Sequence, residues 1–165
     1  MNRHMRLLAA AAVVLCSCAP PIVQSSRYGF RVVGVPSARP EAVDLVVDIV
    51  SSEVSRLTGM DAVSIRRRMV ADASSWTISP RYSSIACSQS ADGWCSGMHS
   101  PADRSIVYVT ERECRGLLVL THEMLHHADW VASGVNHGHS LVGWFGPNPS
   151  TIESRAKAAV WAALC

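Results

Sequence analysis

The amino-acid sequence predicts an α+β domain, in which helices pack against a small sheet, and three observations support this prediction. Apolar residues recur with the period of a helix over residues 41–57 and again over residues 112–133. Between them, residues 104–110 are β-branched and aromatic, which is typical of a short strand. The chain has 165 residues, 48% of them hydrophobic, which is enough for one domain with its own core.

The first 17 residues have the features of a secretory signal peptide. Arg3 and Arg6 precede an apolar run over residues 7–15, which is too short to span a bilayer. The next residues, Leu15-Cys16-Ser17-Cys18, resemble the bacterial lipobox. That resemblance implies a lipoprotein signal peptide over residues 1–17 and a lipid on Cys18.

This N-terminus predicts an exported, membrane-anchored lipoprotein of a bacterial cell envelope, on its periplasmic or extracellular face. Ordinary cleavage near Ala19, without a lipid, is the alternative. Without Arg3 and Arg6, 13 of the 15 basic residues remain against 13 acidic residues, so the mature chain is neutral. A neutral chain offers no electrostatic argument for binding nucleic acid, and we expect none.

Four further cysteines, Cys87, Cys95, Cys114 and Cys165, predict two disulfides in an exported domain. Four cysteines allow three pairings, and the sequence leaves all three open. Cys87 with Cys95 would close a short loop, whereas Cys114 with Cys165 would tie down the C-terminus. No Cys-x-x-Cys pair is present, which argues against a zinc finger.

The N-terminal part of the mature chain reads as a tether followed by a helix. Residues 18–35 are expected to form the tether, with a short strand over residues 28–35, and residues 36–165 the domain. Pro40 precedes the helix predicted over residues 41–57, and Gly59 then ends it.

The middle of the chain is less regular. Residues 64–70 and 76–85 could each be strand or irregular, whereas residues 104–110 are the clearest strand. The long helix over residues 112–133 is expected to end at Gly134.

The C-terminal part is expected to be a loop and a helix. Residues 134–150 contain four glycines and two prolines, which predicts mostly loop. Ser150-Thr151-Ile152-Glu153 matches a capping box, so the last helix should begin there and continue to about Leu164.

The segment His122-Glu123-Met124-Leu125-His126 in the long helix carries the chemistry. Residues four apart lie on one face of a helix, so His122 and His126 can share one zinc ion at about 2.0–2.1 Å. Glu123 lies about 100° around the helix, where it can take a proton from a water on that metal. His-Glu-x-x-His is typical of zinc metallopeptidases, in which this water attacks a peptide carbonyl.

A third protein ligand is needed, and four residues are candidates. His137 and His139 lie on the loop after the helix, which could return over the helix end. Asp129 is more readily a hydrogen-bond partner of a ligand imidazole or a helix-end residue. Glu153 could be a ligand from the last helix, although its expected place in the capping box is already a reason for a glutamate at this position.

Residues 118–145 resemble the SprT-like branch of the zincin metallopeptidases, in which His-Glu-x-x-His is followed by a histidine in a glycine-rich loop and then an aromatic residue. The resemblance implies a zincin-like small sheet packed on the long active-site helix. It makes His122 and His126 metal ligands and Glu123 the general base.

For the third ligand, Gly138-His139-Ser140 followed by Trp144 matches the family pattern, and His137 is the alternative. The resemblance covers about 28 residues. In the metzincin pattern, His-Glu-x-x-His-x-x-Gly-x-x-His, the third histidine would fall at position 132, which is Ala132 here, so that class is disfavoured.

The resemblance implies a zinc-dependent metallopeptidase, a hydrolase whose substrate is a peptide, a protein or a peptidoglycan peptide. The alternatives are a non-catalytic lipoprotein that binds zinc or the cell wall on the same scaffold, and a peptidoglycan amidase or endopeptidase. Because the chain is predicted to be exported, the DNA-linked substrates of intracellular relatives do not carry over.

Other residues have smaller predicted roles. Residues 106–109 could be an edge strand that binds substrate through main-chain hydrogen bonds, or a buried structural strand. His99 or Tyr108 could donate to a developing oxyanion, although a structural role is favoured for each. Trp130 and Trp144 are expected in the core, and His127 is expected to face solvent.

Overall fold

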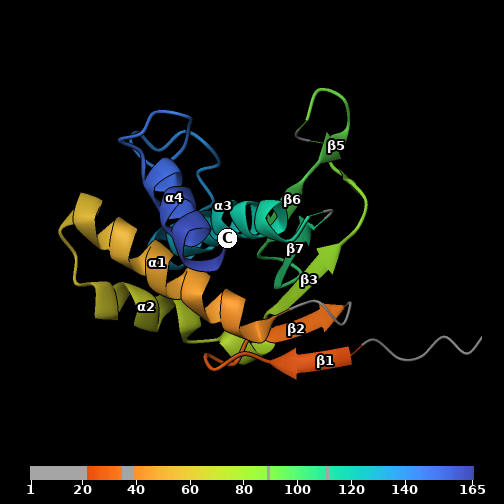
Figure 1. The fold of residues 1–165 in the computed structure, drawn as a ribbon. Helices are drawn as coiled ribbons and strands as arrows, with labels where there is room; N and C mark the ends of the chain where they lie inside the picture. The colour runs from red at the N-terminus through yellow and green to blue at the C-terminus, as the bar shows by residue number, and fades with distance from the viewer. Residues whose placement is uncertain (1–21, 35–38, 89, 111) are drawn as a thin grey trace, which may run out of the picture.

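A computed structural model of the protein describes residues 22–34, 39–88, 90–110 and 112–165. The expected signal peptide and its lipidation site, Cys18, lie outside these residues. The described residues form a mixed α+β structure, with a five-stranded sheet on one side and four α-helices on the other (Figure 1). The predicted α+β class is therefore confirmed.

The sheet is mixed and has the strand order β1-β2-β3-β7-β6. Its central strands β2, β3 and β7 run parallel, and each edge strand, β1 or β6, is antiparallel to its neighbour. The strands are β1 (Ile22–Ser25), β2 (Arg31–Gly34), β3 (Thr77–Arg81), β6 (Gly97–Ser100) and β7 (Ser105–Val109). The strand predicted over residues 104–110 is thus β7, and residues 76–85 contain β3.

The segment expected to be a tether, residues 18–35, is partly built into the sheet. β1 and β2 form an antiparallel pair, and β2 continues the sheet through its parallel pairing with β3. Phe30 and Val32 are buried in the core beneath this part of the sheet. The short strand predicted over residues 28–35 therefore corresponds to β2, and β1 extends the sheet further toward the N-terminus.

Residues 64–70, expected as strand or irregular, are part of helix α2 (Ala62–Val70). The Asp61 side chain caps this helix by accepting a hydrogen bond from the Ser64 amide at 2.8 Å. Ile65 and Met69 lie one turn apart and are both buried, which gives the short helix its apolar face.

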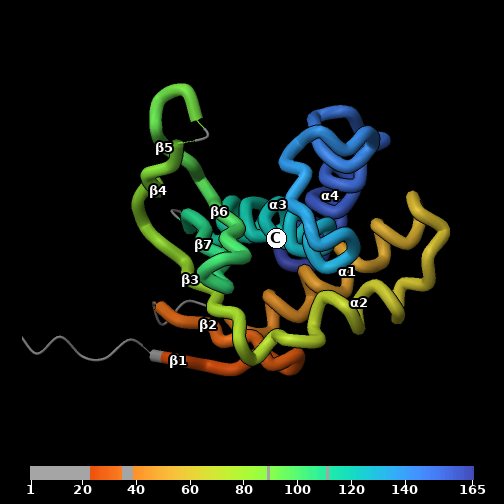
Figure 2. Tube along the Cα trace, turned by 180° about the vertical axis from the view of Figure 1, so that it is seen from behind, coloured from red at the N-terminus to blue at the C-terminus, as the bar shows by residue number. Residues whose placement is uncertain are grey.

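The three longer helices follow the predicted pattern closely. α1 (Pro40–Thr58) ends at Gly59 and α3 (Glu113–Ser133) ends at Gly134, with left-handed φ values of 71° and 75°. Helix α3 packs against β6 and β7 on one side and against α1 and α4 (Ile152–Leu164) on the other. This central position is visible from both sides of the molecule (Figures 1 and 2).

Two disulfides form, Cys87–Cys95 and Cys114–Cys165, with Cα separations of 5.9 and 5.8 Å. The first closes the hairpin of β4 (Ile85–Ala86) and β5 (Trp94–Cys95), which projects from the body of the molecule (Figure 1). The second ties the N-terminal end of α3 to the C-terminal end of α4. Structural disulfides are typical of oxidising compartments, which agrees with the predicted export.

Within the part of the chain that the structure describes, every helix is too short or too polar to cross a bilayer.

Candidate metal centre

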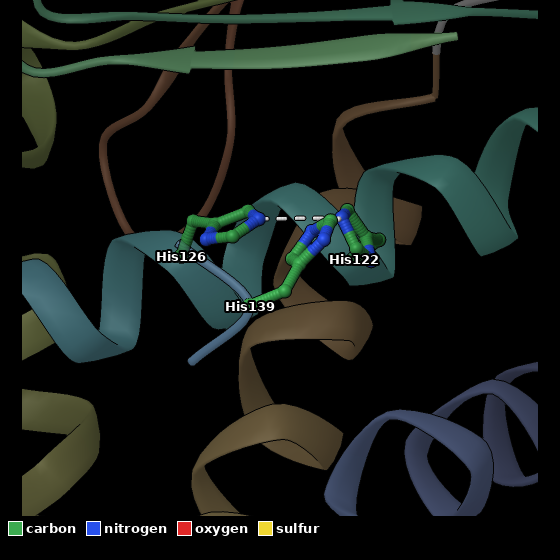
Figure 3. Close-up of side chains that lie close together, drawn as sticks. All are labelled: His122, His126 and His139. Atoms are coloured by element: carbon green, nitrogen blue, oxygen red, sulfur yellow. Dashed lines mark hydrogen bonds between the residues drawn. The ribbon is translucent and has the colours of Figure 1, made fainter. Parts of the chain in front are cut away.

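Three histidines, His122, His126 and His139, converge at the middle of α3. His122 and His126 project from successive turns of the helix, and His139 comes from the loop that follows it (Figure 3). The Nε2 atom of His122 lies 3.2 Å from Nε2 of His126 and 3.1 Å from Nε2 of His139. One nitrogen from each ring lies within 4.8 Å of the other two.

This spacing fits a metal ion. Two nitrogens bound tetrahedrally to zinc at about 2.0–2.1 Å are about 3.3 Å apart, close to the observed separations. Nδ1 of His122 donates to a carboxylate oxygen of Glu153 at 2.9 Å, so Nε2 of a neutral His122 carries a lone pair. That lone pair points at two further ring nitrogens, an arrangement that a cation between them would satisfy.

The charge state of the rings also suits a metal. Burial and the neighbouring rings lower the pKa of His126 to about 4. Burial and His122 lower the pKa of His139. Both rings are therefore neutral imidazoles at neutral pH, the form that binds metals. With the Nε2 lone pair of His122, the chain offers three nitrogen donors at one point.

Glu153, on α4, anchors His122 from outside the cluster. One carboxylate oxygen accepts from His122 Nδ1, and the other accepts from the Gly146 amide at 2.8 Å. Burial raises the pKa of Glu153, but the hydrogen bonds from His122, Gly146 and Lys157 outweigh it and hold the pKa well below its usual range. An ionised carboxylate on a ligand imidazole fixes its tautomer and its orientation.

The expected capping box is wrong, and this explains why Glu153 is free for that contact. The N-cap of α4 is Thr151, whose hydroxyl accepts a hydrogen bond from the Ser154 amide at 3.2 Å. Ser150 lies one residue outside the cap, so Glu153 has no capping role.

Asp129 decides which loop histidine reaches the cluster. Its buried carboxylate accepts from the His137 amide at 2.9 Å and from His137 Nδ1 at 2.8 Å. His137 is thereby held at the end of α3, and His139 is the residue that joins His122 and His126. Of the two roles expected for Asp129, a partner of a ligand imidazole or a polar residue at the helix end, the structure shows the second, because Asp129 binds His137 near the end of α3 and outside the cluster.

Phe145 packs on the cluster, and sequence reasoning missed it. Its ring stacks on His126 with centroids 4.5 Å apart and an angle of 22°, and it also contacts His122 and His139. The family pattern points to the preceding residue, Trp144, which packs against the hydrophobic core. Trp144 and Phe145 are adjacent aromatic residues, and the sequence does not show which of the two side chains the loop directs toward the cluster.

Glu123 lies between α3 and the edge strand β6. Its side chain is buried, and burial raises its pKa to about 7, although His122 and Lys157 act in the opposite direction. A Cβ at Gly97, the first residue of β6, would lie 2.4 Å from Glu123 Oε1. A glycine at this position therefore makes room for the carboxylate.

His127 is fully buried, so the prediction that it faces solvent is wrong. Its Nε2 donates to the Met69 carbonyl at 2.9 Å, and its Nδ1 lies 3.4 Å from His99 Nε2. Trp76 stacks on His99 with centroids 5.1 Å apart. His127 thus lies where α3 packs against β6 and α2, so this histidine pair belongs to the core.

Tyr108 and residues 106–109 have structural positions, which is one of the two alternatives left open for each. Tyr108 is buried in the core, and burial raises its pKa to about 12. Its strand, β7, pairs with β3 on one side and β6 on the other, so residues 106–109 do not form an edge. The strand at the edge beside α3 is β6.

A cleft of about 550 Å³ opens onto the cluster. It is lined by residues from the loop and from α4 together with two of the histidines: His122, His139, Phe145, Gly146, Pro147, Glu153, Ser154 and Lys157. A molecule in this cleft would therefore meet the imidazole cluster directly.

In comparisons with known proteins, no family model, curated protein or solved structure matched the chain.

Proposed function

We propose that this protein is a zinc-dependent metallopeptidase that hydrolyses peptide bonds. One observation supports this proposal most strongly. Three imidazole nitrogens converge at the mouth of a cleft, and Glu123, the residue next to one of them, is buried against an edge strand. The resemblance of residues 118–145 to the SprT-like zincins supports the same assignment.

Each residue of the site would have a distinct role. His122, His126 and His139 would hold zinc, which supplies Lewis acidity toward a water molecule and the scissile carbonyl. Glu123 would accept the proton of the attacking water and pass it to the departing amine. Glu153 would keep His122 in the tautomer that leaves Nε2 free, since its carboxylate accepts from Nδ1.

A peptide substrate is favoured by the position of β6. Among the residues that the structure describes, this strand pairs with β7 along one side only, so main-chain groups on its other side could pair with an extended peptide. Gly97 at its start lies against the Glu123 carboxylate, so a peptide bound along β6 would pass close to the proposed general base.

The location of the substrate follows from the N-terminus and the cysteines. A lipid on Cys18 would hold the protein at a bacterial envelope membrane, and the two disulfides agree with an oxidising compartment. The substrate would be a peptide, an envelope protein or the peptide part of peptidoglycan.

The decisive experiment combines metal analysis with hydrolysis of a broad peptide library. We expect about one zinc per chain, lost in His122→Ala and in His139→Ala but kept in His137→Ala. Glu123→Gln should keep the zinc and lose hydrolysis.

Three results would contradict parts of this proposal. A folded protein that binds no zinc would remove the metal centre altogether. Zinc binding without turnover of peptides would favour the non-catalytic zinc- or cell-wall-binding lipoprotein. Turnover of isolated peptidoglycan, with peptides left intact, would favour the amidase.

A further inference from the structure

The cleft beside the histidine cluster contains a lysine that the proposed reaction does not use. Lys157, on α4, lines the cleft together with His122 and His139, and a third of its side chain is exposed. Apart from the two imidazoles, Lys157 and Glu153 are the ionisable residues that line the cleft. Among the described residues, Lys157 is therefore the one that places an amino group in this cleft.

The Lys157 ammonium uses one of its N–H donors within the protein, whereas both oxygens of its acidic partner, Glu153, already accept hydrogen bonds. An ammonium has three N–H donors, and Lys157 directs one of them to Glu153 Oε1. Glu153 also accepts from His122 Nδ1 through the same oxygen and from the Gly146 amide through the other. Glu153 is thus committed to the protein, and Lys157 can still bind a ligand in the cleft.

The distance to the cluster matches a particular position in a peptide. The path from Lys157 through Glu153 to His122 consists of direct contacts, so the ammonium lies at most about 10 Å from the proposed metal position. Residues of an extended peptide are about 3.3–3.6 Å apart. A carboxylate on the first residue after the scissile bond would therefore fall between the metal and the ammonium.

From this arrangement we propose that Lys157 selects substrates with a carboxylate on the residue that follows the scissile bond. The inference rests on the proposed peptidase function. The carboxylate can be the free C-terminus of the substrate or an acidic side chain at that position, because both present the same chemistry. A charge-assisted hydrogen bond from the ammonium would hold it.

The test uses two pairs of peptides. In the first pair, the residue after the scissile bond ends in a free carboxylate or in an amide. In the second pair, that residue is aspartate or asparagine within a longer peptide. The expected preference for the charged member is about 10–100-fold in kcat/KM, as for other hydrogen bonds to charged groups. The pair with the larger preference identifies the source of the carboxylate.

Variants assign the preference to the lysine. Lys157→Met should reduce the ratio within each pair to near one, and Lys157→Arg should keep most of it. Arg155→Gln removes a cation from the same helix but outside the cleft, where Arg155 binds Glu53 at 2.7 Å, and should leave the ratio unchanged.

A binding measurement separates this proposal from the peptidase assignment. The zinc-loaded Glu123→Gln protein should bind the charged member of each pair about 10–100-fold more tightly, as measured by fluorescence anisotropy. Adding Lys157→Met to that protein should abolish the difference. If no peptide is cleaved by the parent protein but this binding preference is present and depends on Lys157, only the peptidase function fails.

Two results would overturn the selectivity itself. Equal binding and equal turnover within both pairs would show that the ammonium does not recognise the carboxylate of the substrate. Loss of zinc from Lys157→Met would also overturn it, because Lys157 would then act through Glu153 and His122 instead of through the substrate.

Discussion

Gly97 and Glu123 occupy adjoining space, so the size of residue 97 controls where the carboxylate lies. A Cβ there would lie 2.4 Å from Glu123 Oε1 and 2.7 Å from a methyl group of Val119. Gly97→Ala should displace the carboxylate and lower kcat at least about tenfold, a loss that corresponds to about 1.36 kcal/mol in the barrier. Zinc content should stay unchanged, since none of the three histidines is touched.

Ser96→Ala is the matched control, because Ser96 is exposed and precedes the same strand. Full activity in Gly97→Ala, measured on the same substrate, would show that Glu123 tolerates displacement and would contradict its role as general base.

The contact between Glu153 and His122 predicts a second effect at the scale of single residues. Glu153→Gln keeps the shape of the side chain but removes the charge that orients the imidazole. Zinc affinity, measured by competition with a chelator, should fall about 10–100-fold. Glu41→Gln on the exposed side of α1 should have no effect. An unchanged affinity in Glu153→Gln would show that His122 needs no such support.

Much of the site could be predicted from sequence because most of it is local. His122, Glu123 and His126 follow from one helical turn, and His139 follows from the loop pattern. The roles of Glu153, Lys157 and Phe145 depend on how α4 and its preceding loop pack on α3. Such packing has no periodic signal in the sequence. The apparent capping box also suggested another role for Glu153, so its contact with His122 was not predicted.

At the scale of elements, the buried pair His99 and His127 lies where β6 meets α3 and predicts sensitivity to acid. Burial lowers the pKa of His99 to about 3 and that of His127 to about 4, whereas an unfolded histidine titrates near pH 6.5. As the pH falls below about 6.5, the unfolded chain binds protons that the folded chain does not. The free energy of unfolding is therefore largest above about pH 6.5 and decreases toward about pH 4.

Urea unfolding at about pH 7, 6 and 5 measures this dependence. His99→Phe keeps an aromatic ring against Trp76 but cannot take up a proton. The variant should lose stability less steeply between about pH 6.5 and 4, whatever its stability at neutral pH. The same slope in the variant and the parent protein would mean that His99 makes no contribution.

Elements with a strong period were predicted well, and those defined by distant partners were not. α1, α3 and β7 follow directly from apolar spacing and flanking glycines. Helix α2 is short and carries three arginines in a row, so its two buried residues gave a weak signal. β2 lies within the strand predicted over residues 28–35, whereas β1 was expected to be tether and is a strand through its pairing with β2, and strand formation depends on such context.

At the scale of the whole molecule, the disulfide Cys114–Cys165 joins the helix that carries two of the histidines to the helix that carries Glu153. Its sequence separation of 51 residues predicts about 4 kcal/mol of stabilisation from chain entropy. Cys87–Cys95, with a separation of 8, predicts about 2–3 kcal/mol.

Two double variants test this difference by urea unfolding, Cys114→Ser with Cys165→Ser and Cys87→Ser with Cys95→Ser. The first should lose more stability than the second, and it should also bind zinc more weakly because α4 is freer to move from α3. Equal losses in the two variants would show that loop length does not govern the effect.

The three imidazoles of the cluster all come from one helix and the loop after it, with His139 only 17 positions from His122. Loop-closure entropy is small for so short a separation, whereas pairing β2 with β3 has to close a much longer loop. The histidines can thus gather before the sheet is complete, and we expect zinc present during refolding to speed the recovery of native structure. Metal supply would then influence the yield of folded protein as well as its activity.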